Sequence, residues 1–219
     1  KEQQLLTPRV CKKLKTITQN IIWCNCSPLP EMKQGEKNSK NGPNSKDQIF
    51  VNGKKILDNK KHEYYRFYKP KGYVCSHNIQ GNAPTIFELI EKDYLKFGGR
   101  LDKDSEGLML LSTDGEWLDN IFHSKNKVEK TYKVTLTHKI DHNKKVRTNI
   151  NHDGQMLRIS KIKVLNTYSY LVTLTSGKNH EIRRIFRFNK LKIRELKREK
   201  IGKYNLNNMS KGQLFKIEI

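Results

Sequence analysis

The strongest constraint on the fold is a set of short stretches in which apolar and polar side chains alternate. Residues 131–137 place tyrosine, valine and leucine at every second position, between lysine and threonine. Residues 161–165 and 168–175 repeat this pattern, and 64–68 is a further, aromatic stretch. Successive side chains of a strand point to opposite faces of a sheet, so the pattern predicts half-buried strands.

Short helices are expected between these strands. Residues 85–88 have the spacing of a capping box, which indicates a helix start. Residues 116–123 and the very basic stretch 180–191 have helical character, whereas 108–112 is typical of a buried strand and 214–219 of a closing strand. This mixture predicts an α+β domain with a mixed, mainly antiparallel sheet and short flanking helices. No βαβ spacing with a glycine-rich phosphate loop is present, which argues against a nucleotide-cofactor fold.

The first 60 residues carry weaker patterns. Residues 10–23 show a helical periodicity of apolar side chains, and 31–48 is a run rich in lysine, asparagine, glycine and serine. Such a run buries too little apolar surface to offset its ordering entropy, so we expect a flexible basic linker there. Residues 49–56 predict two short strands around Asn52-Gly53, because this dipeptide favours the tight turn of a hairpin.

The charge of the chain favours a polyanionic partner. Forty-four Lys and Arg residues against 22 Asp and Glu residues give a formal net charge of +22. Nucleic acid would neutralise this surplus. An anionic membrane surface is the competing interpretation, but we find neither a basic amphipathic helix with a broad apolar face nor an apolar run long enough to span a bilayer. We therefore expect no membrane partner.

The four cysteines form no paired Cys-x-x-Cys sets, which favours a reduced, intracellular compartment and free thiols. An irregular metal site made by Cys24, Cys26 and a histidine is the alternative. Residues 1–11 lack the apolar core of a secretory signal. We expect an intracellular protein that is not secreted, without a metal.

The densest candidate site lies in residues 98–108, where glycines and acidic residues bracket a turn that leads into an apolar strand. One carboxylate there could be catalytic. The alternatives are a solvated glycine-rich loop or a calcium loop, because Asp102, Asp104 and Glu106 alternate at spacings suited to oxygen ligands.

The second candidate is 176–184, a glycine-containing turn followed by a basic helix start. Arg183 could pair with a buried carboxylate there, while Arg184, Arg187 and Lys190 could bind phosphates. A solvated basic helix is the alternative interpretation. His180 alone is interpreted as a structural hydrogen-bonding residue rather than a general base.

Together these segments resemble a known family. Arg100-Leu101-Asp102, followed by 105–108 and by Thr113-Asp114-Gly115, resembles the signature of RsuA-type pseudouridine synthases, in which this aspartate is catalytic. Further matches occur in the family's order, namely Lys69-Pro70-Lys71-Gly72, Glu129-Lys130-Thr131-Tyr132, Asn179-His180-Glu181-Ile182-Arg183-Arg184 and Ile201-Gly202. The resemblance covers residues 49–219.

The departures from the family pattern are few in this part. Ser105 stands where Thr is commoner, Thr113 where Asn is usual, and Glu181 where Gln is usual. Glu181 adds negative charge near the place where the resemblance puts RNA and the active site. Family members begin with a small RNA-binding domain, of which only a hairpin is recognisable. We therefore predict a degenerate form of it in 1–60 and the catalytic domain in 61–219.

The resemblance implies isomerisation of uridine to pseudouridine in structured ribosomal RNA, without a cofactor or metal. It assigns the ionised carboxylate to Asp102, its cationic partner to Arg183 and the ring beside the uracil to Tyr132. The target base must leave its stack, which selects for unpaired or distorted RNA. The basic residues expected near this RNA are Lys69, Lys71, Arg100, Lys130, Arg184 and Arg187, and Arg100 is expected to be structural as well.

Two other classes remain alternatives. A non-catalytic RNA-binding or ribosome-assembly protein would keep the charge but would not need Asp102, Tyr132 and Arg183 together. A DNA-binding regulator would be expected to show a helix-turn-helix or a basic zipper, and we find neither. A monomer is the default expectation. A bacterial cytoplasm and a eukaryotic organelle, plastid or mitochondrion, both fit the composition.

Overall fold

The computed structural model describes residues 21–24, 48–51, 54–56, 61–78, 81–141, 143 and 145–219. The chain divides into two compact units, residues 1–61 and 62–219. In the first unit, β1 (Ile21–Cys24), β2 (Gln48–Val51) and β3 (Lys54–Ile56) form an antiparallel sheet in the order β1-β2-β3. The two strands predicted within 49–56 are therefore confirmed, while the turn between them lies outside the described residues.

The helix predicted over residues 10–23 is wrong at its end. Ile21 to Trp23 belong to β1, which pairs with β2 in continuous register. The apolar run Ile-Ile-Trp fits a strand because β-branched and aromatic side chains pack well on a pleated surface. The rest of that predicted helix, and the predicted linker up to residue 47, lie outside the described residues.

The second unit is built on a nine-stranded sheet with the order β10-β11-β7-β12-β6-β4-β14, to which β5 adds beside β6 and β13 beside β12. Its strands are β4 (Tyr64–Lys69), β5 (Lys96–Gly98), β6 (Glu106–Ser112), β7 (Lys130–Leu136), β10 (Lys161–Asn166), β11 (Ser169–Leu174), β12 (Ile193–Ile201), β13 (Tyr204–Asn205) and β14 (Leu214–Lys216). The pairing of β6 with β12 is parallel, and the other pairs described in this sheet are antiparallel. A separate hairpin joins β8 (Asn149–His152) to β9 (Gln155–Arg158).

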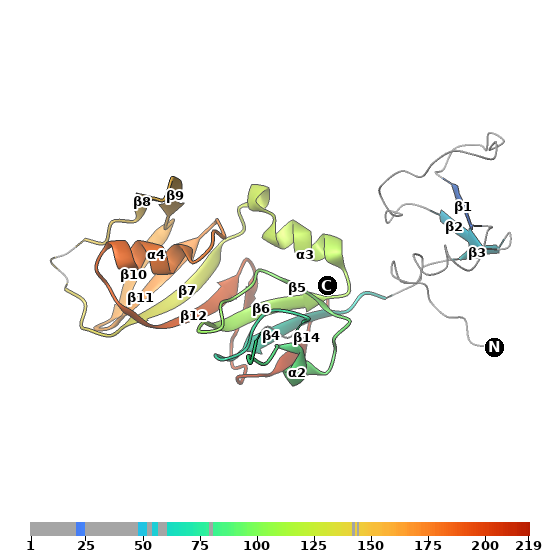
Figure 1. Ribbon diagram of the computed structural model, residues 1–219, viewed down its shortest axis with the longest axis horizontal. Helices are drawn as coiled ribbons and strands as arrows, with labels where there is room; N and C mark the ends of the chain where they lie inside the picture. Colours follow the sequence, from blue (N-terminus) through green and yellow to red (C-terminus); the bar gives the residue numbers. More distant parts are fainter. Residues whose placement is uncertain are drawn as a thin grey trace. The chain divides into compact units, whose positions relative to one another are not determined.

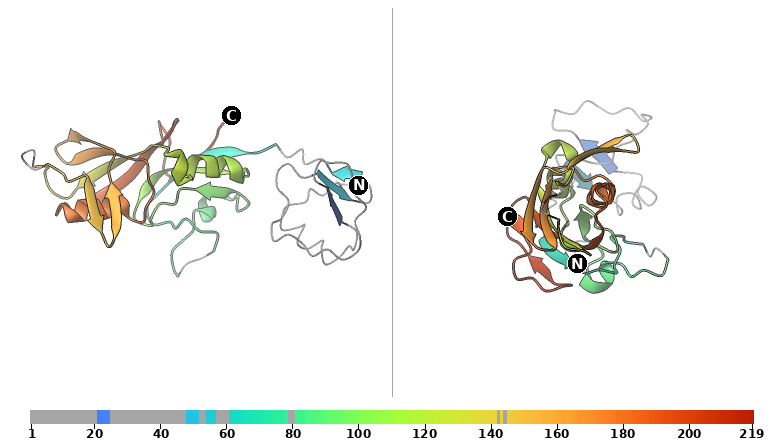
Figure 2. Two further views of the ribbon diagram at one scale, coloured as in Figure 1. Left: turned by 90° about the horizontal axis from the view of Figure 1, so that it is seen from above. Right: turned by 90° about the vertical axis from the view of Figure 1, so that its left-hand side faces the viewer.

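Short helices flank this sheet, as Figures 1 and 2 show. They are α2 (Phe87–Ile90), α3 (Gly115–Phe122), the 3-10 helix η1 (Ser124–Asn126) and α4 (Glu181–Phe188). The Asp114 carboxylate caps α3 by accepting a hydrogen bond of 3.0 Å from the Trp117 amide. The predicted capping box is present in one half: the Glu88 carboxylate accepts from the Thr85 amide at 2.7 Å.

The predicted α+β class, with its mainly antiparallel sheet, is confirmed. The strands and helices expected from residue 64 onward are present with ends shifted by a few residues, and the largest shifts are those of the basic helix, which ends at Phe188, and of the closing strand, which ends at Lys216. The hairpin β8–β9, the short strands β5 and β13, and the central strand β12 were not predicted. None of the helices in the described part of the chain is long and apolar enough to cross a membrane.

The core has two layers because β6 is covered on both faces. Met109 and Leu111 belong to the cluster that includes Ile185 of α4, whereas Leu108 and Leu110 belong to a second cluster with α3. All seven residues of β6 are buried. A strand covered on both sides has no polar face, which is why its sequence is a continuous apolar run.

Gly107 is the tightest point of the sheet. It stands opposite Arg198 in the parallel pair of β6 and β12, with φ at +124°. A Cβ there would lie 2.3 Å from the backbone oxygen and 2.5 Å from the backbone nitrogen of Arg198. Both the backbone angle and the neighbouring strand therefore require glycine.

We expect Gly107→Ala to lower the free energy of unfolding by more than about 3 kcal/mol, because clash and backbone strain add at a position that cannot relax. Gly154→Ala is the matched control, since Gly154 also has a positive φ, +70°, but open space around its Cβ position. It should lose only about 1 kcal/mol. Denaturant unfolding measures both variants, and equal losses would contradict the steric argument.

Candidate active site

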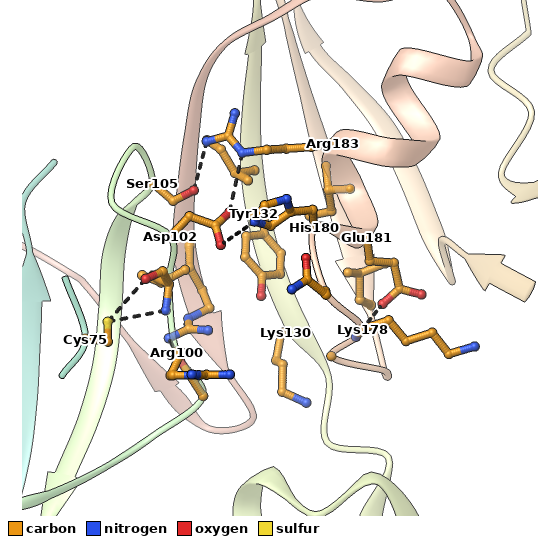
Figure 3. Close-up of a pocket in the computed structure, with 18 of the residues that line it drawn as sticks. Cys75, Arg100, Asp102, Ser105, Lys130, Tyr132, Lys178, His180, Glu181 and Arg183 are labelled. Atoms are coloured by element: carbon orange, nitrogen blue, oxygen red, sulfur yellow. Dashed lines mark hydrogen bonds and ion pairs between the residues drawn. The ribbon is translucent and has the colours of Figure 1, made fainter. Parts of the chain in front are cut away.

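A cleft of about 630 Å³ opens where the turn before β6, strand β7 and the loop before α4 meet. Asp102, Tyr132 and Arg183, the three residues predicted to be catalytic, all line it. Figure 3 shows these side chains together with His180 and Ser105. The two candidate segments of the sequence, 98–108 and 176–184, therefore form one site.

The carboxylate of Asp102 faces two nitrogen groups, one at each oxygen. His180 Nε2 lies 3.3 Å from Oδ1, and Arg183 Nε lies 3.5 Å from Oδ2. Arg183 is fixed from its other side, because Nη2 donates to Ser105 Oγ at 3.0 Å and to the Asp104 carbonyl at 3.3 Å. The predicted pairing of Arg183 with a carboxylate is thus present, and the arginine also holds the turn that carries it.

His180 reaches Asp102 because of its unusual backbone. It directly precedes α4 with φ at +49° and ψ at 28°, in the left-handed region, and its side chain does not cap the helix. About half of the side chain, 54%, is exposed. The sequence interpretation of His180 as a hydrogen-bonding residue rather than a base gave no indication that its partner is Asp102.

The turn that carries Asp102 is held from its buried side by Lys69, which is fully buried. Its Nζ donates to the carbonyls of Ser105 at 2.7 Å, Pro70 at 3.0 Å and Asp102 at 3.1 Å, and to that of Lys103 at 3.5 Å. Burial lowers the pKa of this ammonium below its usual range. The prediction that Lys69 contacts RNA is therefore corrected: all of its donors point into the protein.

Tyr132 lies on β7 with 8% of its surface exposed, and it lines the cleft. In β7 it is flanked by Val172 of β11 and Arg198 of β12, so the sheet fixes the tyrosine from both sides. Tyr132 shares its face of the strand with Val134 and Leu136, as the alternation of the sequence predicted. A flat ring at this place suits the stacking of a heterocycle.

Glu181 lines the cleft but its carboxylate is already occupied. It accepts hydrogen bonds from Ser176 Oγ at 2.7 Å, from the Lys178 amide at 3.2 Å and from the Arg158 amide at 3.3 Å. Only 3% of its surface is exposed. The negative charge is therefore close to the site, as the sequence suggested, but it holds the loop before α4 to the β8–β9 hairpin.

The other basic residues predicted to contact RNA lie in three different places: in the cleft, against the β8–β9 hairpin, and on the surface outside the cleft. Arg100 and Lys130 line the cleft, and burial together with Arg198 lowers the pKa of Lys130. Arg184 binds the β8–β9 hairpin instead, donating to the His152 carbonyl at 2.7 Å and to Gln155 Oε1 at 2.9 Å.

Lys71 and Arg187 are exposed and lie outside the lining of the cleft. The ammonium group of Lys71 and the guanidinium group of Arg187 are therefore accessible to a partner that binds the surface.

Two further lining residues were missed. Arg198 is buried, and its guanidinium donates to the carbonyls of Leu108 and Gly99. The Cys75 Sγ lies 3.4 Å from the amide and 3.3 Å from the carbonyl of Leu101, and burial raises its thiol pKa. A basic residue inside an alternating basic strand gives no sequence signal of burial, so Arg198 could not have been found.

The geometry opposes the alternative of a calcium loop. Asp102 faces His180 and Arg183, whereas Glu106 accepts from the Tyr68 hydroxyl at 3.2 Å and pairs with Lys211 at 2.8 Å. Burial, followed by the charge of Glu106, raises the pKa of Tyr68 to about 12. Across the described residues, no group of three or more His, Cys, Asp or Glu side chains could hold a metal ion. The side chains of Cys24 and Cys26, named in the other metal alternative, lie outside the described part.

Comparisons with known proteins agree on one family. The model of a family described as RNA pseudouridylate synthase matches residues 63–188. Ribosomal small subunit pseudouridine synthase A of Pasteurella multocida is 33% identical over 183 residues, which are 79% of this chain and 77% of that protein. An uncharacterized RNA pseudouridine synthase of Aquifex aeolicus is 33% identical over 188 residues, which are 83% and 77% of the two chains. A solved structure, described as a pseudouridylate synthase, has a TM-score of 0.67 and 27% identity over 81% of this chain and 80% of that chain.

We expect Lys69→Met to lower the free energy of unfolding by about 2–3 kcal/mol, because buried carbonyls lose their donor. Lys71→Met, at an exposed lysine two residues away, should change it by less than about 0.5 kcal/mol. Denaturant unfolding of both variants gives the comparison. A Lys69→Met protein as stable as the Lys71→Met protein would show that the ammonium does not hold the Asp102 turn.

Proposed function

Because the chain belongs to the RNA pseudouridylate synthase family, we propose that it isomerises uridine to pseudouridine in structured ribosomal RNA, with Asp102 as the nucleophile. The observation that carries this proposal is the pairing of the Asp102 carboxylate with His180 and Arg183 at the wall of a cleft large enough for a nucleotide. Ribosomal RNA as substrate is supported by relatives named for the small ribosomal subunit.

In the proposed reaction a carboxylate oxygen of Asp102 attacks C1′ of the ribose. The N1–C1′ bond breaks, and its electron pair leaves with the uracil. The uracil then turns so that C5 faces C1′, a C5–C1′ bond forms, and the bond to the carboxylate breaks. Loss of the C5 proton and protonation of N1 complete the isomerisation, so atoms and charge balance without an oxidant or a cofactor.

Arg183 and His180 prepare the carboxylate for this step. A guanidinium near Oδ2 favours the ionised form that a nucleophile needs, and the His180 imidazole, 3.3 Å from Oδ1, limits the directions in which the group can point. Both partners come from the start of α4, so their spacing is set by one helix. Asp102 is therefore oriented before the substrate arrives.

Tyr132 supplies the surface on which the detached uracil turns. Stacking on a ring does not demand one hydrogen-bond orientation, so the base keeps contact throughout the rotation. Arg100, which is exposed and lines the same cleft, is suited to the phosphates beside the extruded nucleotide, whereas Lys130 is buried and donates to the Val128 carbonyl at 3.2 Å. The attraction of Arg100 offsets part of the few kcal/mol that unstacking the base costs.

The direct test is to incubate the purified chain, and its Asp102→Asn variant, with unmodified ribosomal RNA and to map pseudouridine by chemical labelling and primer extension. We expect a new pseudouridine with the wild type and none with Asp102→Asn, while the RNA affinity of the variant stays within about twofold, since a carboxylate adds nothing favourable to phosphate binding. A variant that turns over at the wild-type rate would refute the role of Asp102. Tight RNA binding without any modification would favour an RNA-binding assembly factor.

A second variant isolates His180. We expect His180→Gly to lower kcat about 10- to 100-fold, the range for the loss of a polar partner of a charged group. Glycine suits the positive φ at this position, so the backbone should stay in place.

Added imidazole should restore part of the activity of His180→Gly, because the histidine side chain is about half exposed and its space can be reached from solvent. His180→Asn is the control: asparagine tolerates the left-handed region but fills the space, so imidazole should not help it. Single-turnover rates with and without imidazole give the answer. Unchanged kcat in His180→Gly would remove this histidine from the mechanism.

A further inference from the structure

Helix α4 continues beyond the cleft with a basic outer face. Its residues Ile182, Ile185 and Phe186 are buried in the core. On the other side Arg187 follows Arg183 by four residues, which places it one turn further along the same face. Lys190, just after the helix, is also exposed. A line of cations therefore leads from the partner of Asp102 to the far end of the helix.

An exposed aromatic ring stands at that end. Phe188, the last residue of α4, keeps 46% of its surface exposed. The guanidinium of Arg147 lies over this ring, 5.7 Å from its centroid. An arginine above an aromatic ring is a pair that can stack with nucleobases, since both groups present flat faces.

The pair is held in place by the side chain of Asn189. Its Nδ2 donates to the Arg147 carbonyl at 3.0 Å, and its Oδ1 accepts from the Arg147 amide at 2.7 Å. The same Nδ2 donates to the Ile185 carbonyl at 2.8 Å, inside the helix. Arg147 is thus tied to the end of α4 by both of its backbone polar groups, and its side chain is directed over the ring.

The charge around the pair is mainly positive. Lys145, Arg147, Arg187, Lys190 and Lys192 are all exposed. In the described part of the chain, Arg147, Arg187 and Lys190 form no ion pair with an acidic side chain. A polyanion complements such a surface.

We propose that Phe188 and Arg147 form a stacking platform for a base of the RNA strand next to the target uridine, with Arg187 and Lys190 on its phosphates. The inference rests on the proposed function in one respect, that the substrate is RNA. Phe188 follows Arg183 by five residues, which is a rise of about 7.5 Å along the helix axis and a turn of about 140° around it. The rise is about that of two stacked bases, so a strand that passes around the end of the helix brings a nucleotide near the target uridine to the platform.

The chain contains a matched control. Phe215 is exposed to the same extent, 48%, and the Arg66 guanidinium lies 4.9 Å from its ring centroid. These two residues are direct cross-strand partners in β14 and β4, so their contact follows from the register of the sheet. Figure 1 shows β14 at the edge of the sheet opposite to β10, away from α4.

The experiment measures RNA binding separately from turnover. The 219-residue chain with Asp102→Asn, which should bind without reacting, serves as the background for Phe188→Ala, Phe188→Trp and Phe215→Ala. The RNA used in this experiment is unmodified small-subunit ribosomal RNA made by in vitro transcription, and each protein is titrated against it at a fixed salt concentration. We expect Phe188→Ala to weaken binding about 5- to 100-fold, the range for the loss of one base–aromatic stack, and Phe188→Trp to retain affinity. Phe215→Ala should bind within about twofold of the background.

The dependence of binding on salt separates stacking from charge. Phe188→Ala should leave the slope of log affinity against log salt unchanged, because a stacked ring releases no counterion. Arg187→Ala should reduce the slope by about 1, as expected for one lost phosphate contact. Equal affinities of Phe188→Ala and Phe215→Ala, whether both fall or both stay, would overturn the platform. The melting temperatures of the two variants show whether a fold defect contributes, and we expect both to match the background.

The two proposals fail separately. If Phe188→Ala weakens RNA binding but the wild-type chain makes no pseudouridine, the platform stands and the catalytic proposal falls. If pseudouridine forms and Phe188→Ala in the otherwise wild-type chain keeps kcat/KM and RNA affinity, the catalytic proposal stands and the platform falls.

Discussion

The site depends on the place where two parts of the sheet meet, at the parallel contact between β6 and β12. Arg198 stands opposite Gly107 of β6 on one side and opposite Tyr132 of β7 on the other. Because Gly107 has no side chain, the two backbones can approach closely there. The turn that carries Asp102 precedes β6, so a single residue of β12 sets the spacing between the turn and the tyrosine.

Two buried cations then complete this junction from within. Lys69 donates to carbonyls of the Asp102 turn, and Arg198 donates to those of Leu108 and Gly99. A buried charge is costly unless its donors are used, and irregular backbone is costly unless its carbonyls are satisfied. Here the buried cations use their donors on these carbonyls, and the carbonyls gain hydrogen bonds, so both costs are reduced together. Some of the many basic residues of the chain, such as Lys69 and Arg198, therefore stabilise loops and are not available to bind a polyanion.

This use of charge explains what the sequence could and could not predict. The alternation around Tyr132 and the apolar run of β6 follow from burial on one or two faces, and both were recognisable. The pairing of Asp102 with Arg183 was expected because the motif resembled that of a family. Lys69 was misassigned because the local sequence around Pro70 is the same whether the lysine ammonium contacts RNA or donates to buried backbone carbonyls. Nothing local in 193–201 distinguishes the buried Arg198 from its exposed neighbours, since its environment is made by β6 and β7.

The start of α4 shows how one local feature serves several roles. The left-handed backbone of His180 turns its side chain away from helix capping and toward Asp102. Glu181, in the first turn, fixes the loop just before the helix instead. Its carboxylate accepts hydrogen bonds from the Lys178 amide and the Ser176 hydroxyl. From there the helix period carries Arg183 to the carboxylate and Arg187 one turn beyond it. Because Glu181 anchors the helix at its first residue, the backbone positions of Arg183 and Arg187 are set relative to the Asp102 carboxylate.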